Sequence, residues 1–241
     1  MARRVPVIHP LWSWVQLRYS VLLVTQLTVF LVYPFCLDTP VGVGVMLGFI
    51  TVTLITAALS LDPQHRGRAY ILAAPTLGFL FAAIATMSDS ALLIACVAGS
   101  LCVAYEIASI FGNALRIERV SIEKVQGSLA VFLLLGLNFA LVYSILELLR
   151  SGSFALGDPP QHIPIHVIET GMSTHMLGFS HLLFHSYMTL CATSYGTVAA
   201  ITPPALALTA LETLIGQLYI AILVAQLMGL HLAFSASSRS R

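Results

Sequence analysis

Long apolar runs separated by short polar breaks dominate the sequence. A helix needs about 20 mostly apolar residues to cross the hydrocarbon core of a bilayer. Six runs approach or exceed that length. They are Tyr19–Leu37, Val41–Leu61, Ala69–Met87, Ala91–Phe111, Gly127–Leu149 and about Pro204–His231. The pattern therefore predicts an all-α integral membrane protein with six transmembrane helices.

The composition supports the same fold class. Of the 241 residues, 58% are apolar and 9% are charged, and the mean hydropathy is +0.93. Soluble domains carry roughly 25% charged residues, so this chain cannot cover itself with a water-facing surface. We expect it to contact membrane lipid. The formal net charge of +1 argues against a nucleic-acid partner.

The cationic residues predict the orientation, because cytoplasmic loops carry an excess of Lys and Arg. A cytoplasmic N-terminus puts all but one of the cationic residues inside. The inside set is Arg3, Arg4, Arg18, Arg66, Arg68, Arg116, Arg119, Lys124, Arg239 and Arg241. Only Arg150 then lies outside. The expected protein is a multi-pass protein of a cell membrane with both termini cytoplasmic.

The segment between the fifth and sixth runs lies on the outer side in this topology. Its part from Phe179 to Leu190 is apolar enough to enter the membrane but too short to cross it. Irregular backbone at membrane depth is tolerated only where it is buried in protein or lines water. We therefore expect a re-entrant pore helix and a filter loop here. The C-terminal end of such a helix carries partial negative charge, which would stabilise a cation.

Two motifs follow one another in this part of the chain. Thr189–Thr197 reads T-L-C-A-T-S-Y-G-T, and Leu211–Tyr219 reads L-E-T-L-I-G-Q-L-Y. Both resemble the potassium-channel superfamily, most closely bacterial two-transmembrane-type ion channel domains. The pattern there is roughly T-L-T-T-x-G-Y-G-D, then a proline-containing turn and an inner helix with L-E-x-x-x-G-Q-L-Y. The match has no gap and covers about residues 126–230.

The resemblance implies two regions and an activity. Residues 1–125 would be a four-helix N-terminal transmembrane region, and residues 126–241 a pore domain of outer helix, pore loop and inner helix. Backbone carbonyls of the family's filter replace the hydration shell of potassium. One loop supplies a quarter of each carbonyl ring, so a homotetramer is implied. The resemblance implies no enzymatic activity and no cofactor, with K⁺ or another monovalent cation as the permeant ion, and it favours a bacterial inner membrane.

The resemblance assigns the selectivity filter to seven consecutive residues. They are Cys191, Ala192, Thr193, Ser194, Tyr195, Gly196 and Thr197. Ser194 stands where the family has glycine, and a side chain at positive φ costs on the order of 1 kcal/mol. Ala192 replaces the threonine whose hydroxyl forms the innermost ion site, and Thr197 replaces an aspartate. Selectivity can therefore be relaxed, and a non-conducting channel-like scaffold or sensor is the alternative.

The inner helix carries three residues assigned to filter support or gating: Glu212, Gly216 and Gln217. In related channels the acid sits behind the filter and holds it by hydrogen bonds. Gly216 is either a hinge or a close-packing position. Glu106, near the inner end of the fourth run, would pair with a side chain such as Arg18 or Arg116 or make an interhelical hydrogen bond.

The residues also bear on voltage sensing, metal binding and proton sensing. No Lys or Arg occurs between Arg68 and Arg116, so the fourth run has no charge to move as a voltage sensor. His181 and His185 are spaced to bind one metal ion, but no third ligand is fixed by spacing and no metal site is predicted. An intramembrane metal-dependent enzyme is a weaker alternative, and proton sensing by the outer histidines stays open.

Overall fold

The computed structural model describes residues 10–32, 42–61, 63–86, 88–114, 122–156, 163–164, 172–193 and 198–239. Seven helices account for most of this part of the chain. They are α1 (Pro10–Val32), α2 (Gly42–Ser60), α3 (Pro63–Thr86), α4 (Asp89–Ala114), α5 (Ile122–Leu149), α6 (Met172–Leu190) and α7 (Pro203–Arg239). Three of them begin at a proline, which suits the first helical position because an N–H there has no intrahelical partner.

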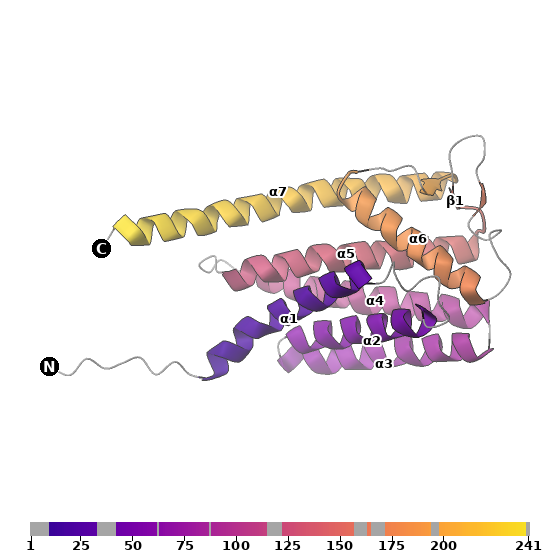
Figure 1. Ribbon diagram of the computed structural model, residues 1–241, viewed down its shortest axis with the longest axis horizontal. Helices are drawn as coiled ribbons and strands as arrows, with labels where there is room; N and C mark the ends of the chain where they lie inside the picture. The colour runs from indigo at the N-terminus through magenta and orange to yellow at the C-terminus, as the bar shows by residue number, and fades with distance from the viewer. Residues whose placement is uncertain are drawn as a thin grey trace.

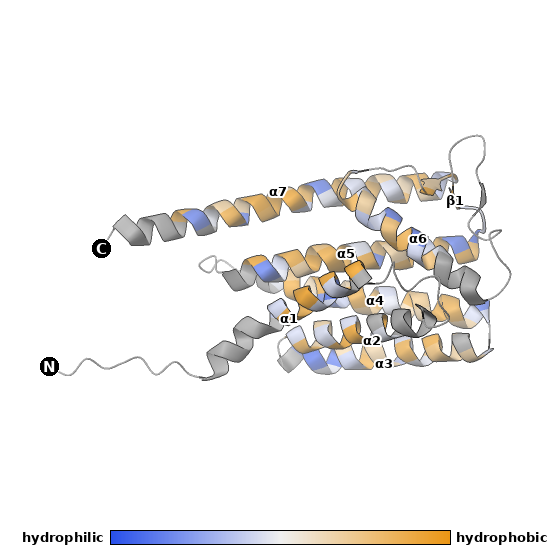
Figure 2. Ribbon diagram, in the orientation of Figure 1, coloured by the Kyte–Doolittle hydropathy of each residue, from blue (hydrophilic) through white to orange (hydrophobic). Residues whose placement is uncertain are grey.

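Three helices are long and apolar enough to cross a membrane. The spans are Asp89–Gly112 in α4, Val125–Leu149 in α5 and Pro203–Gly229 in α7. Apolar residues run along these helices for most of their length (Figure 2). The prediction of a helical membrane protein is confirmed to this extent, whereas six spans with a re-entrant loop stay a prediction.

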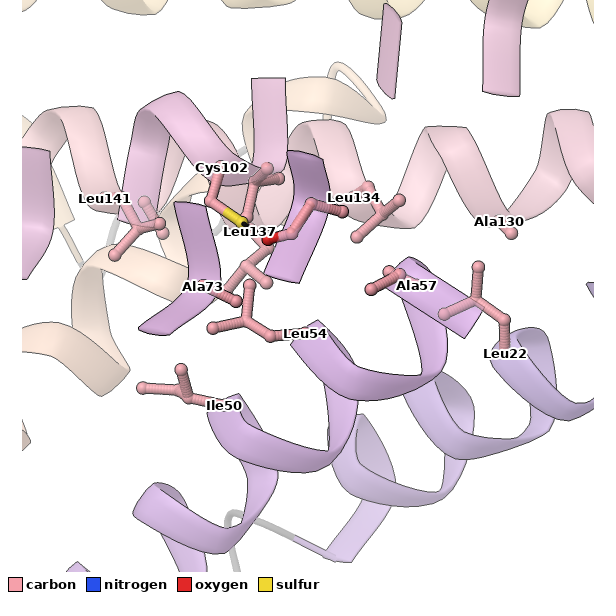
Figure 3. Close-up of a cluster of buried hydrophobic side chains, with 14 of the residues drawn as sticks. Leu22, Ile50, Leu54, Ala57, Ala73, Cys102, Ala130, Leu134, Leu137 and Leu141 are labelled. Carbon is pink, nitrogen blue, oxygen red and sulfur yellow. Dashed lines mark hydrogen bonds between the residues drawn. The ribbon is translucent and has the colours of Figure 1, made fainter. Parts of the chain in front are cut away.

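The first five helices form a bundle around one apolar core (Figure 1). α4 packs between α3 and α5, and α1 packs on α2 and α5. Figure 3 shows Leu22, Leu54, Ala57, Ala73 and Cys102 turned toward that core. The small residues among them, such as Ala57 and Ala73, let the helices approach closely. Phe179, Leu183 and Tyr219 belong to the same cluster. The N-terminal helices therefore share one core with α6 and α7.

A small antiparallel sheet, which the sequence did not predict, lies where α5 ends (Figure 1). The strand order is β2 (Ile163–Pro164), β1 (Phe154–Leu156), β3 (Val198–Ala200). Phe154 is opposite Ala200, and Leu156 is opposite Val198. The chain that follows the filter motif is thereby tied to the chain that follows α5.

α6 crosses the bundle obliquely and begins at the end of the molecule where α5 ends and α7 starts (Figure 1). It is longer than the predicted Phe179–Leu190 and begins at Met172. α6 packs against α5 and α7. α7 continues well past the other helices on the side of the C-terminus.

Candidate functional site

The end of α6 leads directly into the filter motif, and backbone hydrogen bonds define it. The Ala192 N–H donates to the Thr189 carbonyl at 2.9 Å. The Thr193 N–H donates to the Met188 carbonyl at 2.8 Å. With φ of 55° at Ala192, this is the Schellman arrangement that ends many helices. A side chain at this left-handed φ costs about 1 kcal/mol. The strain expected at Ser194 concerns a residue outside the described part of the chain.

Glu212 connects three helices through its two carboxyl oxygens. Its Oε2 accepts a hydrogen bond from the Tyr143 hydroxyl of α5. Its Oε1 lies 2.5 Å from the Ser186 hydroxyl of α6. All three side chains are fully buried, and buried hydrogen bonds are costly to leave unmade. The Glu212 carboxyl of α7 therefore holds α6 against α5.

The protons in this cluster can be counted. The Ser186 Oγ also lies 2.7 Å from the Gly136 carbonyl, but a hydroxyl has one proton to donate. The Ser186 hydroxyl can donate that proton to Glu212 or to Gly136; the case in which it goes to the Gly136 carbonyl makes a demand on Glu212. A second proton must then lie between Ser186 and Glu212. The donors and acceptors balance when Glu212 is a neutral carboxylic acid that donates to Ser186 and accepts from Tyr143.

Two glycines let the helices beside α6 approach it. A Cβ at Gly136 of α5 would lie 2.6 Å from Cδ1 of the Tyr187 ring. A Cβ at Gly216 of α7 would overlap the Leu190 carbonyl oxygen and lie 2.9 Å from the carbonyl carbon. α7 is continuous through Gly216. The geometry therefore gives Gly216 a close-packing contact with the last residue of α6.

Glu147 anchors the sheet beside the filter motif. Its Oε1 accepts a hydrogen bond from the Gly152 N–H at 2.8 Å, and its Oε2 accepts one from the Phe154 N–H at 3.0 Å. Gly152 has φ of 83°, a conformation that glycine adopts without steric cost. The turn places Phe154 at the start of β1, which pairs with β3. Glu147 thus fixes the strand that holds the chain leaving the filter segment.

The predicted filter falls partly within the described residues. Cys191, Ala192 and Thr193 are exposed in the single chain. The other predicted filter residues lie outside the described part: Ser194, Tyr195, Gly196 and Thr197. Of the inner-helix residues, Glu212 and Gly216 are buried and face α6, whereas Gln217 is exposed. Gln217 therefore lies on a different side of α7 from Glu212 and Gly216.

His181 and His185 lie on α6, as the sequence analysis expected. The His185 ring packs beside the rings of Tyr143 and Phe154, with centroids 5.7 and 5.8 Å away. The His185 Nε2 atom is buried and has no hydrogen-bond partner among the described residues. Within the described part of the chain, no group of three His, Cys, Asp or Glu side chains is placed to hold a metal ion.

Glu106 of α4 is buried without a visible partner. Its side chain is fully buried, and neither carboxyl oxygen has a hydrogen-bond partner among the described residues. The expected interhelical hydrogen bond is therefore not seen there, whereas Arg116 and the side chain of Arg18 lie outside the described part of the chain. Burial of a polar group without a hydrogen bond costs about 1–3 kcal/mol in proteins.

We therefore expect Glu106→Met to raise the free energy of unfolding by about 1–3 kcal/mol. Methionine has a similar volume and adapts to irregular space. Thermal unfolding of the purified protein in mild detergent measures the change. Glu106→Ala is the matched control and should destabilise, because it leaves a cavity. A lower melting temperature for Glu106→Met would show that the carboxyl has a partner in the assembled protein.

Several residues of the site were missed by the sequence analysis. They are Gly136, Tyr143, Glu147 and Ser186. Tyr143 and Glu147 are spaced i,i+4 on α5 and so share a helix face, which was the available signal. Ser186 in an apolar half-helix gave no comparable signal, since serine occurs throughout membrane helices.

Comparison of the chain with protein-family models, with curated proteins and with solved structures found no match in any of the three. What can be said of function therefore depends on the filter-like motif and on the geometry around α6.

Proposed function

We propose that the chain is one subunit of a homotetrameric cation channel resembling potassium channels, which conducts ions passively through a carbonyl-lined filter. The observation that carries this proposal is the contact between Leu190, where α6 ends, and Gly216. Gly216 lies about 20 Å along α7 from Pro203, at 1.5 Å per residue. The hydrocarbon core is about 30 Å thick. A half-helix that ends at this depth would deliver residues 191–197 into the membrane interior.

The chain on both sides of the filter motif supports the same proposal. Before the motif, Glu212 and Gly216 hold the end of α6. After it, β3 pairs with β1, and the Ile201 N–H donates to the Ser153 carbonyl at 2.9 Å. A filter loop must be held at both ends if its carbonyls are to replace a hydration shell. This chain has an anchor at each end.

The N-terminal helices would brace the pore domain within a six-span subunit. Phe30 of α1 packs edge-on against Tyr187 of α6, with ring centroids 4.9 Å apart. Phe111 of α4 packs on Tyr219 of α7, with centroids 5.8 Å apart. These contacts reach α6 and α7 from helices that carry none of the channel motif. The proposed topology has both termini in the cytoplasm of a bacterial inner-membrane protein.

A first experiment measures oligomer mass and then current. The full chain is purified in mild detergent, its mass is determined, and it is reconstituted into a planar bilayer with K⁺ on one side and Na⁺ on the other. A tetramer whose reversal potential lies near the potassium value supports a selective channel. A reversal near zero with clear current supports a non-selective cation channel. A tetramer without current contradicts the proposal and favours the alternative, a non-conducting scaffold or sensor. The departures from the family motif at Ala192 and Ser194 are the sequence features that favour this alternative.

The filter itself provides a prediction. We expect Ser194→Gly to increase the potassium-to-sodium permeability ratio about tenfold, which corresponds to about 1.4 kcal/mol. Glycine removes the penalty for a side chain at positive φ in every subunit. The measurement is the shift of the reversal potential relative to the unmodified protein.

Ala192→Thr is the comparison for Ser194→Gly. It restores the hydroxyl of the family motif, but a β-branched residue is strained at the φ of 55° seen for Ala192. We expect it to reduce tetramer stability without improving selectivity. An unchanged permeability ratio in Ser194→Gly, or a larger gain in Ala192→Thr, would contradict this assignment.

A further inference from the structure

Gln217 is a polar residue of the motif in α7, and the structure leaves it exposed. It follows Gly216, whose backbone touches Leu190 at the end of α6. Gln217 therefore lies at the depth where the filter motif begins. None of the hydrogen bonds among the described residues involves its side chain.

The direction of Gln217 follows from helix geometry. At 3.6 residues per turn, Gln217 is about 140° around α7 from Glu212, which faces α5 and α6. Its side of the helix is exposed along its length. That side is formed by Ala210, Leu214, Gln217, Ala221, Val224 and Met228. Gln217 thus points away from its own subunit, from a face that is otherwise apolar.

An amide at this depth requires either water or another protein group. In lipid, an unsatisfied polar group is costly, and glutamine in membrane helices usually makes interhelical hydrogen bonds. In a tetramer built around α6 and α7, a side chain just below the filter and directed away from its own subunit can face the central axis. Four copies then form a ring of amides.

We propose that the four Gln217 amides line the water-filled path just inside the filter and that their carbonyl oxygens coordinate the permeant cation there. The inference rests on the proposed channel function. Carbonyl oxygens are suitable ligands for hard cations. Ala192 carries no side-chain oxygen, and a cation at that depth gains from an additional oxygen ligand. Gln217 is placed to supply it.

Thiol accessibility tests the position of Gln217 without requiring current. The full-length Gln217→Cys protein in vesicles is treated with a membrane-impermeant cationic thiol reagent, and its α7 peptide is analysed by mass spectrometry. α7 contains no native cysteine, so the reading is specific. Leu218→Cys, on the adjacent exposed side of α7, is the matched control. We expect at least tenfold faster labelling at 217 than at 218. Equal labelling, or none at 217, would overturn the inference.

Conductance tests the coordination. We expect Gln217→Leu to lower single-channel K⁺ conductance about tenfold, whereas Gln217→Asn, which keeps the amide, retains most of it. If the unmodified channel conducts and Gln217→Leu conducts equally, the coordination is refuted while the channel function stands. If the unmodified tetramer carries no current, the channel function fails, and the labelling result alone decides whether Gln217 lines an aqueous path.

Discussion

Glu212→Ala is expected to lower the free energy of unfolding by about 3–5 kcal/mol, because it removes a buried hydrogen-bond partner and leaves a cavity. The Tyr143 hydroxyl loses its acceptor and the Ser186 hydroxyl loses a neighbour, and each buried unsatisfied group costs about 1–3 kcal/mol. The carboxyl also fills space between three helices, so a cavity adds to the loss. Thermal unfolding and oligomer mass in detergent measure the effect.

Glu212→Gln is the matched control for this prediction. Its amide oxygen can accept from Tyr143 while its NH₂ group donates to Ser186, which reproduces the proton arrangement inferred for the acid. We expect a loss below about 1 kcal/mol and a protein that stays assembled. If Glu212→Gln is as unstable as Glu212→Ala, then Glu212 is ionised and needs both oxygens as acceptors.

The helices were predictable because the apolar runs are long and the breaks between them are short. The helix boundaries were less so. α3 begins at Pro63 rather than at Ala69, because polar and basic residues such as Arg66 and Arg68 continue a helix beyond its apolar part. The β-strands could not be predicted, since strands of two or three residues give no periodicity and β2 ends in proline.

The candidate site was only half visible in the sequence. Glu212 and Gly216 belong to a recognisable motif. Their residue types also indicate candidate functional positions, because one is an acid and the other a glycine within a membrane helix. Their partners come from distant positions, with Tyr143 and Ser186 separated from Glu212 by 69 and 26 residues. No local pattern encodes such a pairing, because it depends on how three helices pack. The resemblance likewise gave Gly216 two possible roles, and only the contact with Leu190 distinguishes them.

Gly216→Ala is expected to destabilise the protein less than Glu212→Ala does, through a clash with backbone atoms. The added Cβ would lie 2.9 Å from the Leu190 carbonyl carbon and 3.0 Å from its Cα. Because these are backbone atoms at the end of a capped helix, no side chain can rotate to make room. Overpacking of this kind typically costs 1–3 kcal/mol. We expect loss of K⁺ flux and a lowered melting temperature.

Gly78→Ala is the control, because a Cβ at Gly78 of α3 meets nothing within 4 Å. There alanine should stabilise the helix by about 0.5–1 kcal/mol and leave flux unchanged. The two substitutions have the same chemistry, so their difference isolates the contact with α6. A hinge at Gly216 predicts another result: Gly216→Ala would keep its stability and assembly and change only the opening of the pore. Measuring flux and melting temperature on the same preparations therefore distinguishes the packing contact from a hinge.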